Sequence, residues 1–201
     1  KNLVVTQDLF RHHCFEITVP FNELEKKDEI FFHSSHTDVC GKALSVSFES
    51  LVKKAPFEFR FKGIVTEIML SNLSDFSNVF IIKGYSPTLL MEDCSQKRTF
   101  VKKNMRQIFE TVLNDYPGNV IKKKLNPRSK SIIPYAVQYD ESNFSFISRL
   151  AAEYGEWLYY DGREIILGNA NDGGEVNFLI DRNQSLDLSI SLMPAKFNNS
   201  G

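Results

Sequence analysis

Four histidines are the side chains of this chain best suited to metal binding or proton transfer. His33 and His36 are three residues apart and lie close in sequence to Asp38 and Cys40. Imidazole, carboxylate and thiolate groups are the ligands that zinc prefers. The spacing matches no closed zinc motif, however, and the chain has no Cys-x-x-Cys pair. The His12–His13 pair opens a predicted strand, where neighbours face opposite ways. We therefore interpret these histidines as solvated turn residues and expect neither a metal nor another cofactor.

The same stretch could supply a nucleophile and its base. Ser34, Ser35 and Cys40 carry hydroxyl or thiol groups, and His36 with Asp38 could activate one of them. A working triad must be assembled in space, and the chain lacks the Gly-x-Ser-x-Gly turn of many hydrolases. A hydrolase built on His36 and Asp38 stays open as the least favoured alternative. We expect no enzymatic activity and no small-molecule substrate.

Positive charge is concentrated in one part of the sequence. Residues 97–130 contain ten Lys or Arg and two Asp or Glu, a formal balance of +8, whereas the rest of the chain balances at −9. The basic residues that could face a partner are Lys97, Arg98, Lys102, Lys103, Arg106, Lys122, Lys123 and Lys124. We interpret the region as a solvated helix face followed by a basic loop.

An alternative function follows from that charge. The chain could be a non-enzymatic β-barrel module that binds nucleic acid or an acidic protein through residues 97–130. Nucleic acid is the less favoured of these partners, because few aromatic side chains interleave with the cations to stack on bases.

Composition limits the class of protein. The 201 residues suffice for one large domain or two small ones, and 42% hydrophobic with 24% charged residues excludes a disordered or collagen-like chain. The three cysteines, Cys14, Cys40 and Cys94, are odd in number and widely spaced, which favours reduced thiols over a disulfide framework. No apolar run approaches the roughly 18 residues of a membrane span, and no signal peptide opens the chain. The start at Lys1 and the ending AKFNNSG indicate a piece of a longer protein.

The first 85 residues predict an antiparallel barrel or sandwich. Apolar residues alternate in CFEITVP, from Phe15 to Val19, and again in ALSVSFESLV. FEFRFKGIVTEIML, residues 57–70, predicts one long bent strand with a bulge at Gly63, and NVFIIKGYSP predicts another strand.

The pattern becomes mixed after Pro87. Residues 99–114 place apolar side chains on one helical stripe, and Pro117-Gly118 should end that helix. A strand over 134–139 should lead into a second helix, capped by Asp140 or Ser142 and stopped by Gly155 in a left-handed conformation. Asp161-Gly162 predicts a tight hairpin, and two weakly alternating strands follow in 176–193.

Four stretches of sequence form an ordered set. They are HHCFEI at 12–17, FKGIVTEI at 61–68, YSPTLL at 85–90 with RTF at 98–100, and QYDESNFSFISRL at 138–150 with EYG at 153–155. In this order they resemble the hub region of the VgrG spike proteins of type VI secretion and the tail hub proteins (late control protein D) of contractile phages. The residues that carry the motifs are Gly63, Tyr85, Pro87, Gln138, Tyr139, Glu141, Ser142, Phe146, Arg149, Leu150 and Gly155.

This resemblance implies an α+β fold. Residues 1–85 would form the first part of an antiparallel, tube-like β-barrel hub domain. Residues 86–169 would be an inserted α+β domain with two helices and a β-hairpin, and 170–201 would return to the barrel or begin a further domain. The motif residues would then have structural roles, and no catalytic residue is needed.

The resemblance also implies a function and partners. The intact protein would form a homotrimer that caps a hexameric tube and carries a puncturing needle. Its partners would be itself, the tube protein, baseplate proteins and secreted effectors. It would reside in the bacterial cytoplasm before firing and then be delivered outside the cell or into a target cell.

Overall fold

A computed structural model describes residues 2–25, 31–49, 58–73 and 77–168, all within one compact unit that spans residues 1–170. The strands predicted within 176–193 lie outside these residues. None of the described helices is long and apolar enough to cross a lipid bilayer.

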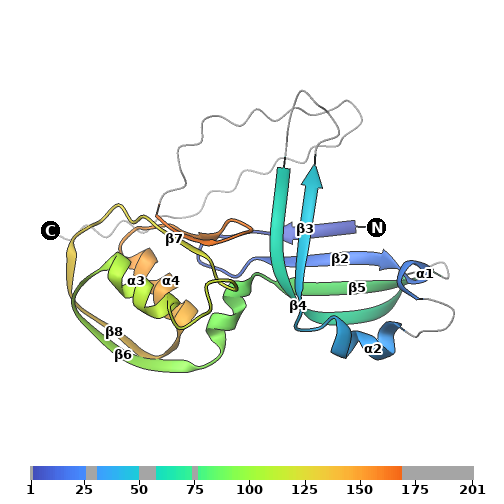
Figure 1. Cartoon of the computed structure of the whole chain (residues 1–201), viewed down its shortest axis with the longest axis horizontal. Helices are drawn as coiled ribbons and strands as arrows, with labels where there is room; N and C mark the ends of the chain where they lie inside the picture. Colours follow the sequence, from blue (N-terminus) through green and yellow to red (C-terminus); the bar gives the residue numbers. More distant parts are fainter. Residues whose placement is uncertain (1, 26–30, 50–57, 74–76, 169–201) are drawn as a thin grey trace. The chain divides into compact units, whose positions relative to one another are not determined.

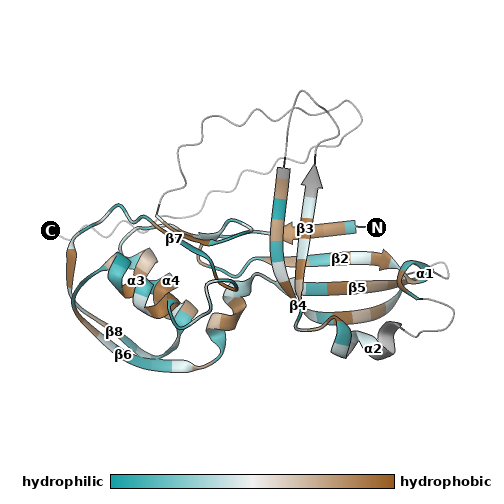
Figure 2. Ribbon diagram, in the orientation of Figure 1, coloured by the Kyte–Doolittle hydropathy of each residue, from teal (hydrophilic) through white to brown (hydrophobic). Residues whose placement is uncertain are grey.

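The N-terminal part is a five-stranded antiparallel sheet. Its strands are β1 (Asn2–Thr6), β2 (Cys14–Pro20), β3 (Ala43–Glu49), β4 (Glu58–Leu73) and β5 (Ser77–Tyr85), in the spatial order β1-β2-β5-β4-β3. The sheet curls into a half-barrel, with α1 (Phe21–Leu24) and α2 (Phe31–Asp38) beside it (Figure 1). Figure 2 shows apolar residues along β2, β4 and β5. The predicted α+β class with a curled antiparallel sheet is confirmed.

The bulge in β4 lies between Val65 and Glu67, not at the predicted Gly63. Gly63 has a different task, because a Cβ there would lie 2.6 Å from the ring of Phe15. A Cβ on Gly84 of β5 would lie 2.5 Å from the same ring. The two glycines therefore leave the space that Phe15 fills, while the bulge bends the strand further along.

The second part is built from two long strands, three short strands and the helices that they surround. It contains the 3-10 helix η1 (Pro87–Glu92), β6 (Ser95–Asn104), α3 (Met105–Leu113), β7 (Lys123–Leu125), β8 (Ile132–Ser142), α4 (Asn143–Glu153), β9 (Leu158–Tyr160) and β10 (Ile165–Leu167). β6 and β8 form an antiparallel ribbon that curves around α3 and α4 (Figure 1), and β7, β10 and β9 form a small sheet. Side chains from the ribbon, both helices and the small sheet share one buried core.

The first six residues of the helix predicted over 99–114 belong to a strand. Residues up to Asn104 belong to β6, and α3 begins at Met105. The Asn104 side chain accepts a hydrogen bond from the Gln107 amide, and the Gln107 side chain accepts one from the Asn104 amide, so this capping box fixes the helix start. The helix ends at Leu113, four residues before the predicted stop at Pro117.

Of the two predicted N-caps of the second helix, Ser142 is the one observed. Ser142 accepts the hydrogen bond of the Ser145 amide and is the N-cap of α4. Asp140 instead adopts a φ of 53° beside a register shift of the β6–β8 ribbon and accepts a hydrogen bond from Ser95. Gly155 has the predicted left-handed conformation, with a φ of 65°.

The predicted tight turn lies one residue later than Asp161-Gly162, at Gly162-Arg163, because the Asp161 amide donates to the Glu164 carbonyl at 3.1 Å. β9 ends at Tyr160 and β10 begins at Ile165. The carboxylate of Asp161 accepts hydrogen bonds from the amides of Arg163 and Glu164, which stabilises this turn.

Candidate functional site

The first, third and fourth sequence motifs meet at the His12–His13 pair. The His13 amide donates to Ser86 Oγ at 3.2 Å, and Ser86 and Thr88 hydroxyls lie 2.7 Å apart. The Thr88 hydroxyl is 2.8 Å from His12 Nδ1, and His12 Nε2 is 3.1 Å from a Glu92 oxygen. Because Nε2–H must donate to the carboxylate, Nδ1 accepts from Thr88, and Ser86 in turn donates to Thr88. One continuous chain of hydrogen bonds therefore joins the start of β2 to η1.

The two histidine rings also pack on the second part of the molecule. His12 lies 3.8 Å from the Phe144 ring centroid, and His13 meets Tyr160 edge-on at 6.1 Å. The ring of Tyr160 is buried in the same cluster as Phe15 and Phe61 of the sheet. The histidines are thus structural residues of a junction, and the interpretation of this pair as solvated turn residues is wrong.

Burial sets the protonation of both rings. It lowers the pKa of His13 below the ordinary 6.5, although the Asp8 carbonyl and the nearby carboxylates of Asp8 and Asp161 act in the opposite direction. It also lowers the pKa of His12, against the opposing effect of Glu92. His13 Nε2–H donates to the Asp8 carbonyl at 3.0 Å, and Nδ1 accepts from Gln7 at 3.3 Å, so the neutral ring has both nitrogens satisfied. Two neutral imidazoles in this setting stabilise the fold.

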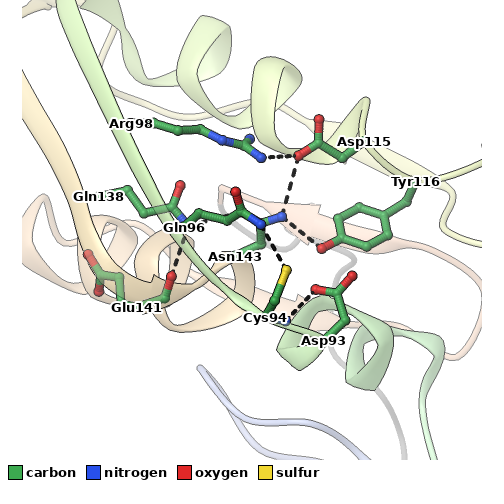
Figure 3. A network of polar contacts seen from close by, with 9 residues as sticks. All are labelled: Asp93, Cys94, Gln96, Arg98, Asp115, Tyr116, Gln138, Glu141 and Asn143. Carbon is green, nitrogen blue, oxygen red and sulfur yellow. Dashed lines mark hydrogen bonds and ion pairs between the residues drawn. The ribbon is translucent and has the colours of Figure 1, made fainter.

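A polar network lies between the β6–β8 ribbon and the ends of the helices (Figure 3). Buried Gln138 donates to Asn143 at 2.9 Å and to the Glu141 carbonyl at 3.2 Å. Asn143 donates to the Tyr116 hydroxyl at 2.7 Å and to Asp115 at 3.4 Å, and Asp115 also holds Arg98 in an ion pair. A buried amide pair that is hydrogen-bonded in this way fixes one arrangement of the ribbon and helices.

Arg149 forms the ion pair that the sequence left open. Its guanidinium donates to both carboxylate oxygens of Glu141 and to the Val137 carbonyl at 3.0 Å. It also lies 5.5 Å over the Phe146 ring. A two-pronged contact of this kind is specific for arginine, since a lysine ammonium cannot make it.

The remaining motif residues divide between core and surface. Phe146 and Leu150 are buried, and Phe146 stacks on Phe100 at 5.5 Å. Pro87 is buried at the start of η1. Tyr85 and Tyr139 are exposed, at 39% and 71%.

The basic residues predicted to face a partner do not form one continuous surface of unpaired charges. Arg98 pairs with Asp115, Arg106 with Glu110, and Lys123 donates to Asn114. Lys97 lies 5.2 Å over the ring of Tyr139. Lys102, Lys103, Lys122 and Lys124 are exposed.

One basic grouping was missed. Arg60, Lys62 and Arg163 line a cavity together with Lys122, although they are far apart in the sequence. Only strand register and a loop contact bring them together, so no local signal could have identified them.

The structure describes only some of the residues considered for a zinc site or a hydrolase. His33 and His36 belong to α2, and their side chains lie outside what the structure describes. Among the described residues, no three His, Cys, Asp or Glu side chains gather as a metal site requires. All three cysteines are free thiols, with Cys14 and Cys40 partly buried and Cys94 exposed.

Comparison with solved structures identifies similar folds at low sequence identity. The E. coli c3393 protein is described as a component of the type VI secretion system with structural similarity to the T4 tail proteins gp27 and gp5. It has a TM-score of 0.59 and 16% identity over 88% of this chain and 51% of its own. The 43 kDa tail protein of prophage MuSo2 from Shewanella oneidensis has a TM-score of 0.57 and 17% identity, over 84% and 49%. A chain of the half-lidded Francisella PdpA–VgrG complex has a TM-score of 0.52 and 12% identity, over 83% and 26%.

These matches establish the fold, and the chain spans about half the length of the first two structures. Comparison with curated proteins gives no match. A family model described as phage tail baseplate hub (GPD) matches residues 12–185, which include all four motifs. The resemblance inferred from those motifs is confirmed, and the chain belongs to the phage tail baseplate hub family.

Proposed function

We propose that this chain is part of the structural hub of a contractile injection machine and has no enzymatic activity of its own. The observation that carries the proposal is the match of the hub family model over residues 12–185. The geometry is consistent with a structural role, because the motif residues form the histidine junction, the polar network and parts of the two hydrophobic cores. Buried polar groups that are hydrogen-bonded to one another, such as the Gln138 and Asn143 side chains, rigidify a fold.

The partners follow from the same role. The intact protein would associate with itself as a homotrimer and would contact a hexameric tube protein, baseplate proteins and secreted effectors. One of the similar structures is a complex of VgrG with PdpA, which supports a hub that binds other proteins. The protein would stay in the bacterial cytoplasm until firing and then leave with the needle.

A complementation experiment tests the hub function. A strain that lacks the gene is complemented with the full-length wild type, with Gly84→Ala, or with Gly118→Ala, and contractile particles are counted by electron microscopy. A Cβ on Gly84 would lie 2.1 Å from the Ile64 carbonyl, whereas nothing lies within 4 Å of one on Gly118. We expect particles only with the wild type and Gly118→Ala. Normal particles in the deletion strain would refute a hub role, and light scattering of the purified full-length protein tests for a trimer.

The alternative of a binding module on residues 97–130 makes a different prediction. Nucleic acid binding at physiological salt should then weaken in Lys102→Gln/Lys103→Gln, which removes two exposed cations. We expect no such binding, because Arg98 and Arg106 are already paired with acids of their own chain.

A further inference from the structure

A basic cavity lies beside the end of the sheet. Its volume is about 500 Å³. It is lined by residues of β3 and β4, by the loop before β7 and by the β9–β10 loop. The lining residues used below are Ser45, Ser47, Arg60, Lys62, Lys122 and Arg163.

Side chains that the pairing of β3 and β4 aligns form one wall of the cavity. Ser45 pairs with Lys62, and Ser47 pairs with Arg60. Side chains alternate along a strand, so these four lie on one face, opposite to the buried Phe61. The two serines are short, which leaves room above them for a ligand between the longer cations.

The β9–β10 loop forms a second wall and is held against β4. The Lys62 amide donates to the Gly162 carbonyl at 2.9 Å, and a Cβ on Gly162 would lie 2.2 Å from the Arg60 carbonyl. β5 pairs with β4 only from Ile64 onward, so the loop occupies the edge of β4 that β5 leaves. Lys62 Nζ also reaches the Asn119 carbonyl, at 3.5 Å. These backbone contacts hold the loop in place, so the cavity has a defined shape in the folded chain.

The lining is strongly positive. Arg60, Lys62, Lys122 and Arg163 contribute four cations, and no Asp or Glu is among the lining residues. The whole chain has a formal net charge of −1, so this concentration is not a property of the whole surface. A concave site with charges of one sign raises the local concentration of ligands of the other sign.

We propose that this cavity binds the acidic side chains of an extended segment of a partner protein. β3 is one of the two outer strands of the sheet among the described residues, and three consecutive β3 residues, 45–47, line the cavity. An extended segment that lies across the cavity would present alternate side chains to this wall, so that its carboxylates meet Lys62 and Lys122. No exposed aromatic ring lines the cavity, which disfavours nucleic acid, because single strands bind by stacking bases on such rings.

This proposal rests on the hub function, because it names the chemistry of one hub partner. Its test is binding by the purified chain and does not depend on particle assembly. Loss of peptide binding with normal complementation would overturn only this proposal. Normal binding with normal particles in the deletion strain would overturn only the hub.

The probe is a short fluorescein-labelled peptide in which glutamate alternates with serine, titrated with the chain and followed by fluorescence anisotropy. The same peptide with glutamine in place of glutamate measures binding without carboxylates. The pocket variant is Lys62→Gln/Lys122→Gln, and the matched control is Lys102→Gln/Lys103→Gln, which removes the same charge from outside the cavity. Circular dichroism verifies the fold of each variant.

We expect the wild type to bind the glutamate peptide and not the glutamine peptide, with weaker binding as salt rises. The pocket variant should bind about tenfold more weakly, the loss expected for two charge contacts, whereas the control stays within about twofold. Ser47→Glu, which adds a carboxylate to the cavity and removes no cation, should weaken binding as well.

Three results would overturn the proposal. The wild type could fail to bind the glutamate peptide. Both double variants could weaken binding equally, which would make the effect one of net charge. Finally, oligo(dT) could bind more tightly than the peptide and lose its affinity in the pocket variant, which would assign the cavity to phosphate groups of nucleic acid.

Discussion

Arg149 is a structural residue that a sequence reader could take for a functional one. It is about half exposed, yet it joins β8 to α4 through Glu141, the Val137 carbonyl and the Phe146 ring. Exposed guanidinium groups often serve a partner, but three contacts within the same chain give this one a role in the fold. Its substitution should therefore change stability.

Arg149→Ala should lower the free energy of unfolding by about 1 kcal/mol, because a half-exposed ion pair contributes little more than that. Glu141→Ala should cost a similar amount. In urea unfolding, the double variant should cost less than the sum of the two single variants, because the pair can be lost only once. Glu153→Ala is the control, since Glu153 lies 3.8 Å from the guanidinium and should cost less. Strictly additive costs would contradict a direct Arg149–Glu141 interaction.

His13 should make the stability depend on pH. Its pKa in the folded chain is lowered by burial, whereas in the unfolded chain it returns to about 6.5. Between those two values the unfolded chain binds the proton more readily. Stability should therefore be complete above about pH 6.5 and fall as the pH is lowered below it.

Urea unfolding at pH 7.5 and 5.5 measures this effect. His13→Gln, which keeps a polar side chain without a titrating ring, should be less stable than the wild type at pH 7.5 and lose less on acidification. His12 titrates in the same direction and will leave part of the dependence. Equal losses in wild type and His13→Gln would mean that His13 does not carry the effect.

At the scale of the elements, the close contact between β2, β4 and β5 depends on small residues. Gly84→Ala should lower the free energy of unfolding by about 3 kcal/mol, because its Cβ would meet both the Ile64 carbonyl and the Phe15 ring. Gly118→Ala should change it by less than about 1 kcal/mol. Thermal unfolding of both variants measures the difference. A Gly84→Ala protein as stable as the wild type would show that β4 and β5 can separate without cost.

The elements were largely predictable where one periodicity dominates. Alternation in CFEITVP and ALSVSFESLV correctly indicated β2 and β3. The helix was predicted to begin too early because Phe100 and Val101 fit the helical stripe that continues into α3. They fit a strand equally well, and they belong to β6. The pair Asn104 and Gln107 carried the correct boundary, as an N-cap with its partner three residues on.

The candidate site was predictable only in part, for a physical reason. The motif at 138–150 identified Gln138, Glu141 and Arg149 but not their partners, because Asn143, Asp115 and Tyr116 are brought in by the tertiary fold. The junction role of His12 and His13 requires Ser86 and Thr88, more than seventy residues later. The basic cavity combines residues of β3, β4, the loop before β7 and the β9–β10 loop, and of its four cations only Lys122 lies within the basic run at 97–130.

At the scale of the whole molecule, the described residues contain two hydrophobic cores. One core belongs to the helices and the β6–β8 ribbon, and the other to the half-barrel. They are linked by Tyr160, which belongs to β9 but is buried with Phe15 and Phe61, and by the contact of Gly162 with β4. Loosening that contact should uncouple the two parts without altering either core.

Gly162→Ala tests this coupling. Gly162 has a φ of 97°, and a Cβ would press on the Arg60 carbonyl at 2.2 Å, so the loop must leave β4. The Lys62 amide, which donates to the Gly162 carbonyl, should then exchange with solvent deuterium much faster, whereas amides inside α4 should keep their protection.

Gly155→Ala is the matched control, with a φ of 65° and open space around a Cβ. It should cost about 1 kcal/mol locally and leave Lys62 protected. Because the same loop walls the basic cavity, Gly162→Ala should also weaken glutamate-peptide binding. Unchanged exchange at Lys62 would mean that the Gly162 contact does not couple the two parts.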